Sequence, residues 1–357
     1  MRKTVAVALV GVLVVAAAQP AAAAPGWKNV KSKAFKRAGG LVSVAAVNRK
    51  AIFAIGEKGT PFHWNGKAWT ARKGAGSFLA MGIAASGAKK AWAVGFSGAT
   101  PVAIAWNGRK WRKVRYEGAP KLPIPIPIPV VPIAVDASPD GAAWSIGGLN
   151  NRNDGPSVVR RWNGKAFVNA TVPLPPSASL TAVSVRNRKD VWLAGTYTAN
   201  GTQVKPLVMH LTGGSWKNVS PSGDWGVIGQ PHNIVQDIVA TGPASAWAIR
   251  SQNGGGLLRH KGGRWAEAGT PAMIAPYALA TDGGSGAWAI PVPGFGGAKA
   301  RYLHWTGRWT VVSGPSHGAN NALIRDIDHV PGTKMTVAVG GVTGKAGKQY
   351  PLVEVHR

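Results

Sequence analysis

The 357-residue chain has no cysteine, and its 13 acidic residues are far outnumbered by 42 lysines and arginines. The lack of thiols excludes disulfides, cysteine-ligated metal centres and catalysis by a thiol nucleophile. The shortage of carboxylates restricts acid–base catalysis, because a glycosidase needs two of them about 5–10 Å apart. We expect no catalytic residue, no cofactor and no metal site.

Long hydrophobic runs and helical periodicity are also missing after the N-terminal segment. The apolar stretches are short, and 48 glycines and 26 prolines interrupt the chain. Short apolar runs between glycine-rich and proline-rich stretches are typical of strands and turns. Because 45% of the residues are hydrophobic, the composition predicts an all-β fold with a large core.

The N-terminal segment has the pattern of a targeting sequence. Arg2 and Lys3 precede an apolar run from Val5 to Ala18, and small residues follow. This order is that of a secretory signal peptide, and the run is too short to span a bilayer comfortably. We predict a signal peptide over residues 1–24 and a mature protein that is extracellular, in solution or at the cell wall, without a transmembrane segment.

The charge is strongly positive. The formal net charge is +29, or +27 once Arg2 and Lys3 are removed with the signal peptide. A field of this sign attracts polyanions such as anionic wall polymers, acidic polysaccharides or nucleic acid. The alternative interpretation is a general adaptation for solubility.

A short motif recurs along the chain. Its clearest copy, Ala91 to Trp111, contains an apolar strand, a loop, a second strand, an Asn-Gly turn and a tryptophan. Asn and Gly tolerate the positive φ angles that tight hairpins need. The motif recurs at intervals of about 40–50 residues, which is the period of propeller blades. The first strand carries one aromatic or aliphatic anchor per copy: Phe53, Trp92, Trp144, Trp192, Trp247, Trp288 and Val337.

A second aromatic anchor follows the turn of each repeat except the last, which stops at Arg357. The missing copy is at the other end of the chain, because Gly26–Val30 reads like residues 215–219. The mature N-terminus is therefore predicted to supply the outer strand of the final repeat, which removes a free sheet edge. The six regular anchors are Trp69, Trp111, Phe167, Trp216, Trp265 and Trp309.

Together these patterns predict one all-β domain over residues 26–357. We predict a seven-bladed β-propeller with four-stranded blades, closed by the N-terminal strand. The predicted blades cover about residues 41–73, 78–116, 132–172, 179–221, 233–269, 277–314 and 322–357, the last together with 26–30.

Fifteen of the 16 tryptophans fall on repeat positions, and we assign them to the core between blades. Trp225 lies outside the repeat, beside Asp224 in a glycine-rich loop, and is therefore a candidate ligand contact. Arg152, Asp154 and Phe295 are further candidates, because they belong to loops that vary between copies.

The densest group of basic residues surrounds Trp111, on the predicted outermost strand of the second blade. Positive charge there either protects a sheet edge from aggregation or contacts a polyanion. The turns between first and second strands add basic residues, for example Arg49-Lys50 and Lys89-Lys90, which predicts one basic rim. The group around Trp111 consists of Arg109, Lys110, Arg112, Lys113 and Arg115.

Histidines recur at the end of the third strand. Equivalent positions are spread around a ring, so we expect hydrogen bonds within each blade rather than shared metal ligation. These histidines are His63, His210, His260, His304 and His356.

Several carboxylates are predicted on or near the innermost strands, where they could approach a central channel. Asp326 and Asp328 alternate onto one strand face. They are interpreted either as an acid–base pair or as hydrogen-bonded strand ends, and Asp190 as part of a turn. The predicted channel carboxylates are Asp136, Asp237, Asp282, Asp326 and Asp328.

The pattern AWAVG…HWNG followed by a tryptophan resembles secreted β-propeller repeat proteins of high-GC Gram-positive bacteria. These are grouped with kelch-like or galactose-oxidase-like propellers, and the WNG-x-x-W ending is similar to that of tryptophan-rich propeller lectins. The resemblance implies the fold. Galactose-oxidase chemistry is not implied, because it needs a cysteine-linked tyrosine.

Three functions follow from these observations. The first is a secreted, non-enzymatic and monomeric binding protein for an extracellular anionic polymer or glycan, with a protein partner as a further option. The second is a multivalent propeller lectin with sugar sites between blades. The third is a polysaccharide hydrolase or lyase that uses channel carboxylates.

Overall fold

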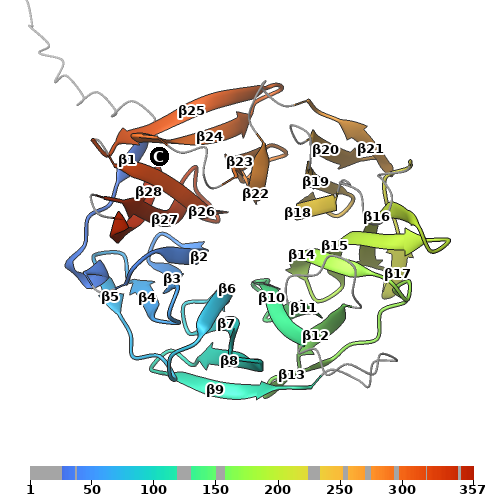
Figure 1. The fold of residues 1–357 in the computed structure, drawn as a ribbon, viewed down its shortest axis with the longest axis horizontal. Coiled ribbons are helices and arrows are strands. Elements are labelled where there is room, and N and C mark those ends of the chain that lie inside the picture. The colour runs from blue at the N-terminus through green and yellow to red at the C-terminus, as the bar shows by residue number, and fades with distance from the viewer. Residues whose placement is uncertain are drawn as a thin grey trace, which may run out of the picture.

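The computed structural model describes residues 26–36, 38–118, 130–149, 157–223, 234–251, 256–269, 275–292, 297–318, 320–344 and 347–357. Strands arranged around a centre dominate these residues (Figure 1). In the described part of the chain, no helix is long and apolar enough to cross a membrane. The predicted signal peptide lies outside the described residues.

The described residues up to Asn218 hold one short 3-10 helix, η1 (Lys33–Phe35), and seventeen strands. They are β1 (Trp27–Asn29), β2 (Leu41–Asn48), β3 (Ala51–Gly56), β4 (Pro61–Trp64), β5 (Trp69–Ala71), β6 (Leu79–Gly87), β7 (Lys90–Ser97), β8 (Thr100–Trp106), β9 (Trp111–Tyr116), β10 (Val130–Ala137), β11 (Ala143–Leu149), β12 (Val158–Trp162), β13 (Ala166–Asn169), β14 (Ser179–Asn187), β15 (Asp190–Ala199), β16 (Gln203–Thr212) and β17 (Ser215–Asn218).

The second half continues with the same succession of strands. They are β18 (Ile234–Gly242), β19 (Ser245–Ser251), β20 (Gly256–Lys261), β21 (Arg264–Glu267), β22 (Pro276–Thr281), β23 (Ala287–Pro291), β24 (Lys299–Trp305), β25 (Trp309–Ser316), β26 (Asn321–His329), β27 (Thr336–Thr343) and β28 (Gln349–His356).

Sequence neighbours pair antiparallel in groups of four, which we call units. Within each unit the first strand lies nearest the centre and the fourth lies outermost (Figure 1). Five units form separate four-stranded sheets. The units β6–β9 and β10–β13 form one eight-stranded sheet, because β13 pairs parallel with β9 at Ala166↔Arg115 and Phe167↔Tyr116.

The last unit is completed from the N-terminus, as the sequence predicts. β1 pairs antiparallel with β28, with Trp27 opposite His356 and Asn29 opposite Glu354. Trp27 stacks on Tyr302 with ring centroids 3.7 Å apart, and it meets Trp288 edge-on at 5.4 Å. The chain ends are thus joined by main-chain pairing and by an aromatic cluster shared with the preceding unit.

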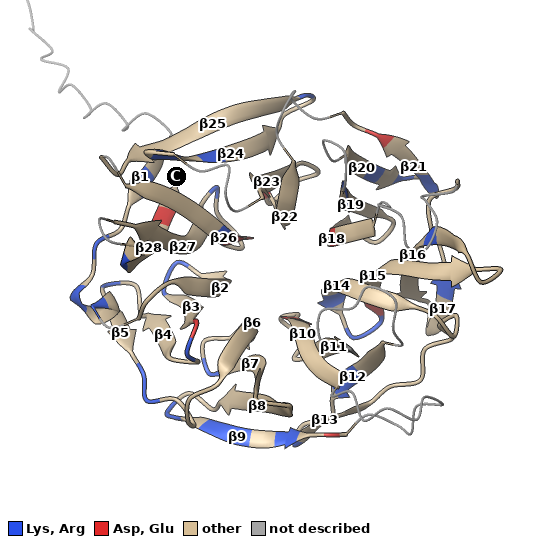
Figure 2. Ribbon diagram, viewed as in Figure 1, with Lys and Arg blue, Asp and Glu red and all other residues tan. Residues whose placement is uncertain are grey.

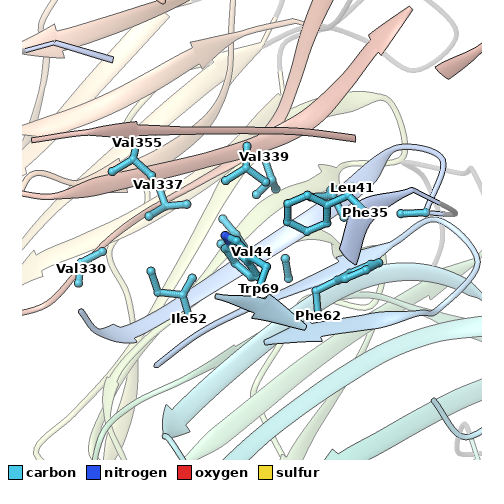
Figure 3. Close-up of a cluster of buried hydrophobic side chains, with 13 residues drawn as sticks. Phe35, Leu41, Val44, Ile52, Phe62, Trp69, Val330, Val337, Val339 and Val355 are labelled. Carbon is cyan, nitrogen blue, oxygen red and sulfur yellow. The ribbon is translucent and has the colours of Figure 1, made fainter. Parts of the chain in front are cut away.

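The hydrophobic core lies between neighbouring units. At several junctions an aromatic residue on the second strand of one unit packs against the tryptophan before or after the tight turn of the next. Trp92 contacts Trp162, and Trp247 contacts Trp305 and Trp309. Figure 3 shows the hydrophobic cluster between the last unit and the first, where the second strand carries Val337 in place of an aromatic residue. Most repeat tryptophans therefore serve packing, as predicted.

The Asn-Gly turns differ from the prediction in one respect. The glycines have positive φ, for example 93° at Gly66 and 89° at Gly108, but their asparagines do not. Instead, the side-chain oxygen of Asn65 accepts hydrogen bonds from the main-chain N–H groups of Lys67 and Ala68. The asparagine therefore stabilises the turn through its side chain.

Closure by β1 leads to a test. We expect Trp27→Ala to lower the free energy of unfolding by about 3–5 kcal/mol, because it removes a buried aromatic side chain and leaves a cavity. Lys28→Ala on the same strand, whose side chain is exposed, is the control and should change little. Chemical denaturation measures both variants. Equal stability of Trp27→Ala and wild type would show that this strand does not close the ring.

Candidate functional site

Five sequence-predicted contact residues cannot be compared with the structure. They are Asp224, Trp225, Arg152, Asp154 and Phe295, all of which lie outside the described residues. The second group of candidates, around Trp111, is described in full.

The basic residues of β9 point to solvent around the outer rim of the ring. Arg112, Lys113 and Arg115 are exposed, whereas Trp111 between the units is 5% exposed. Figure 2 marks these basic residues along β9. The predicted edge position is only partly correct, because the C-terminal end of β9 pairs with β13. Edge protection therefore does not account for Arg115.

Basic residues of several turns gather on the rim next to β9. Trp64 Nε1 donates to the carbonyl of Arg49 at 3.0 Å, which ties two turns of the first unit together. A side chain at Gly66 would meet Lys50 Cγ at 3.0 Å, and one at Gly108 would meet Lys89 Cγ at 2.9 Å. Within each of the first two units the turns are therefore in contact, and no carboxylate occurs in them.

We call the resulting surface the basic band. Its side chains are exposed, and in the described part of the chain none of them forms an ion pair. A groove of about 590 Å³ lies on it, bounded by residues 48–51, Ala88 and residues 331–333. The basic band consists of Arg49, Lys50, Lys67, Lys89, Lys90, Arg109, Lys110, Arg112, Lys113 and Arg115.

The channel at the centre of the ring is lined by four of the five predicted carboxylates. Asp136, Asp237, Asp326 and Asp328 border a space of about 520 Å³. Asp282 is placed differently, because it follows β22 and lies 3.6 Å from His304.

Each channel carboxylate joins its own unit to the next one. Asp326 Oδ2 accepts from the main-chain N–H of Val44 at 2.8 Å, and Asp328 Oδ2 accepts from Ala46 at 2.7 Å. Asp136 and Asp237 accept in the same way from Val185 and Leu279. Their other oxygens accept the N–H of the following residue in the chain. Of the two interpretations of these residues, the contacts favour hydrogen-bonded structural groups.

Removal from bulk water affects the ionisation of these carboxyl groups. Burial in the channel wall raises the pKa of Asp136 and Asp326 to about 6 and that of Asp237 to about 7. The pKa of Asp328 is raised well above its usual range for the same reason. The two N–H donors at each group oppose this shift, because they stabilise the ionised form.

Asp190 has a larger role than the turn residue that the sequence predicts. It is 7% exposed and accepts hydrogen bonds from Trp192 Nε1 at 3.0 Å and Arg186 Nη1 at 2.6 Å, while His210 Nε2 lies 2.9 Å away. Burial lowers the pKa of His210, although Asp190 favours its charged form. Only the spacing Arg186-x₃-Asp190-x-Trp192 could have suggested this network.

The other recurrent histidines fit the expectation of contacts within a unit only in part. His260 Nδ1 lies 3.1 Å from the carbonyl of Ala244. His63 instead stacks on Phe53, and both of its ring nitrogens lack a hydrogen-bond partner.

Comparison with known proteins identifies the fold and nothing more specific. No family model and no curated protein matches the sequence. Many solved structures share the architecture, and the three described below do so at 10–15% identity. The structure described as YCF48 bound to D1 peptide aligns at a TM-score of 0.59 and 15% identity, covering 94% of this chain and 98% of its own.

The other two are propeller domains. The WD40 β-propeller domain of Doa1 aligns at a TM-score of 0.58 and 14% identity, covering 93% of this chain and 97% of its own. The β-propeller domain of Cps50 (Swd1) from Myceliophteria thermophila aligns at 0.58 and 10%, covering 92% and 98%. The chain is a β-propeller. Function must be argued from the surfaces of this propeller, because many unrelated functions share the fold.

The channel carboxylates lead to a pH-dependent test. Because the folded state raises the pKa of Asp237 to about 7, the folded protein binds a proton that the unfolded chain releases above about pH 4. This contribution to stability is complete at low pH and is lost as the pH rises through about 7. We therefore expect the stability of wild type relative to Asp237→Asn to increase when the pH falls from 8 to 5.

Asp140→Asn provides the matched control. Burial alone would raise the pKa of Asp140, but hydrogen bonds from Ser138 and Arg188 hold it far below its usual range. Asp140 is therefore ionised in both the folded and the unfolded state between pH 5 and 8. The difference in free energy of unfolding between wild type and Asp140→Asn should stay constant over this range. Urea denaturation at several pH values measures both differences. A constant difference for Asp237→Asn would contradict the assigned shift.

Proposed function

We propose that this propeller is an exported, non-enzymatic binding protein that holds an anionic extracellular polymer on its basic band. The observation that carries the proposal is the set of exposed cations along β9 and in the turns of the first two units, with no carboxylate among them. A repeating anion can contact many such side chains at once and release its counterions. Export rests on the signal-peptide pattern of residues 1–24.

We count the eight-stranded sheet as two blades joined by β13 and β9, so that the propeller has seven blades. In this arrangement the basic band extends over the first two blades. The acidic side chains that face the channel take part in contacts between blades. Because these acids are not on the outer surface, that surface is more positive than the overall composition implies.

The alternatives are less well supported by the contacts. In a lectin with several equivalent sites, the spaces between blades would be open, but aromatic pairs such as Trp92–Trp162 and Trp144–Trp216 occupy them. In a hydrolase or lyase, the channel carboxylates would need free oxygens, but main-chain donors contact both oxygens of Asp326. A protein partner remains an alternative, since the YCF48 structure contains a peptide.

Binding of the mature protein to a bacterial cell-wall preparation tests the proposal, at salt concentrations from about 50 to 500 mM. Affinity should fall steeply with salt, because counterion release drives the binding. Arg112→Gln combined with Lys113→Gln should weaken binding at low salt. The slope of the logarithm of the binding constant against the logarithm of the salt concentration should decrease in magnitude by roughly one unit for each cation that no longer pairs with the polymer.

The control removes the same charge from another part of the ring. Lys261→Gln combined with Arg264→Gln changes two exposed side chains at the turn between β20 and β21 and should leave the slope unchanged. Equal effects of the two double variants would show that only net charge matters. Binding that is insensitive to salt would show that the polymer is not held by its charge.

A further inference from the structure

One junction between units departs from the aromatic packing found elsewhere. In three units a second-strand aromatic stacks on a histidine of the third strand. The centroid distances are 4.7 Å for Phe53–His63, 3.8 Å for Trp192–His210 and 3.9 Å for Trp288–His304. These second-strand aromatics also fill the space against the following unit, as Phe53 does against Trp106 and Trp111.

In the last unit both positions of this pair are valine. Val337 of β27 lies opposite Val355 of β28, at the register where these three units pair an aromatic with a histidine. The following unit still presents Trp64 and Trp69, which correspond to Trp106 and Trp111. Phe35 packs against Trp69 in this junction (Figure 3). The smaller valines nevertheless leave an open space beside Trp64 and Trp69.

A pocket of about 450 Å³ occupies this junction. Val337 and Val355 lie at its base, where they are 0% and 9% exposed. Trp64 is held in its wall by the hydrogen bond from its Nε1 to the carbonyl of Arg49. The complete lining is Val30, Arg49, Ile52, Trp64, Gly66, Trp69, Lys334, Met335, Val337, Val355 and Arg357.

The lining separates into an apolar interior and a cationic rim. Its charged side chains are those of Arg49, Lys334 and Arg357, and each of these residues is exposed. Among the described residues, no acidic side chain lines the pocket. The rim therefore has an excess of positive charge.

This chemistry selects among ligands. A sugar carries several hydroxyl groups, and the apolar interior offers them few hydrogen-bond partners, so burying them would be unfavourable. A flat apolar body would contact the two tryptophans and the valines, and an acidic group on it would meet the basic rim. The volume lies within the range of about 300–1,000 Å³ typical of small-molecule pockets.

We propose that this pocket binds a small hydrophobic anion, namely an aromatic ring system that carries one carboxylate or sulfonate-like group. The proposal goes beyond the proposed function, because it concerns the interior of one junction, whose rim shares only Arg49 with the basic band. Either can fail without the other.

The test uses two fluorescent probes that differ only in one sulfonate group. 1-Anilinonaphthalene-8-sulfonate has the proposed chemistry, and N-phenyl-1-naphthylamine is its uncharged parent. We expect one saturable site per chain for the sulfonate, with weaker binding of the parent. Galacturonic acid and glucose at millimolar concentration should not displace the sulfonate.

Val337→Trp places in this junction the residue type found at the equivalent position of other units. We expect it to fill the pocket and to weaken sulfonate binding at least tenfold. Circular dichroism and the unfolding midpoint establish that the variant is folded. Val337→Ile is a second variant with a smaller added volume, and its effect should be intermediate.

Arg49→Gln combined with Lys334→Gln tests the rim. We expect sulfonate binding to weaken roughly three- to tenfold, as for partly exposed charge pairs, while binding of the uncharged parent is unchanged. The Arg112→Gln, Lys113→Gln variant should bind the sulfonate as wild type does.

Several outcomes would overturn the proposal. One is undiminished binding to folded Val337→Trp, and another is displacement of the sulfonate by galacturonic acid. Equal losses of affinity for both probes in the rim variant would disprove selection for an anion.

The same variants separate the two proposals. Salt-dependent binding to cell walls that survives in Val337→Trp would leave the basic band as the polymer site.

Discussion

Each four-strand unit has two broad faces, and both must be covered by neighbouring units for the ring to be stable. Aromatic side chains provide part of this contact, beside many aliphatic ones: a second-strand residue such as Trp92 or Trp247 reaches across to the tryptophans of the next unit. Burial of large aromatic surfaces supplies the main favourable free energy. The same packing explains why the chain needs no disulfide, and why Trp27 must return to complete the last unit.

A second set of contacts joins the units at their inner strands. Asp136, Asp237, Asp326 and Asp328 accept main-chain N–H groups from the next unit, so scarce carboxylates are used in the interior. Glu354 is likewise fully buried, between Tyr302 and His317. Cations on the outer surface consequently have few acidic neighbours. The positive field of the basic band is therefore a result of where the fold places its acids as well as of composition.

Comparison of the repeats shows that the last unit differs from the others at one packing position. When most units place an aromatic at one position, a unit with valine there has space that its neighbour does not fill. Packing in protein interiors is dense, so such a space rarely remains without a reason. At the junction of β27 and β28 with the first unit, the space is open to solvent and bordered by cations. The two proposed sites thus have different origins, one in accumulated surface charge and the other in a missing side chain.

The sequence by itself determined the all-β class, the repeat, the packing role of most tryptophans and the return of Trp27 to the last unit. These features follow from local periodicity, and each repeat reports the same pattern again. Only the tertiary structure decided that β9 pairs with β13, that Asp190 forms a buried network, and that Val337 faces Trp64 and Trp69. Those contacts join residues from different strands or units, and their distances depend on how the ring closes. No local pattern in the chain encodes that closure geometry.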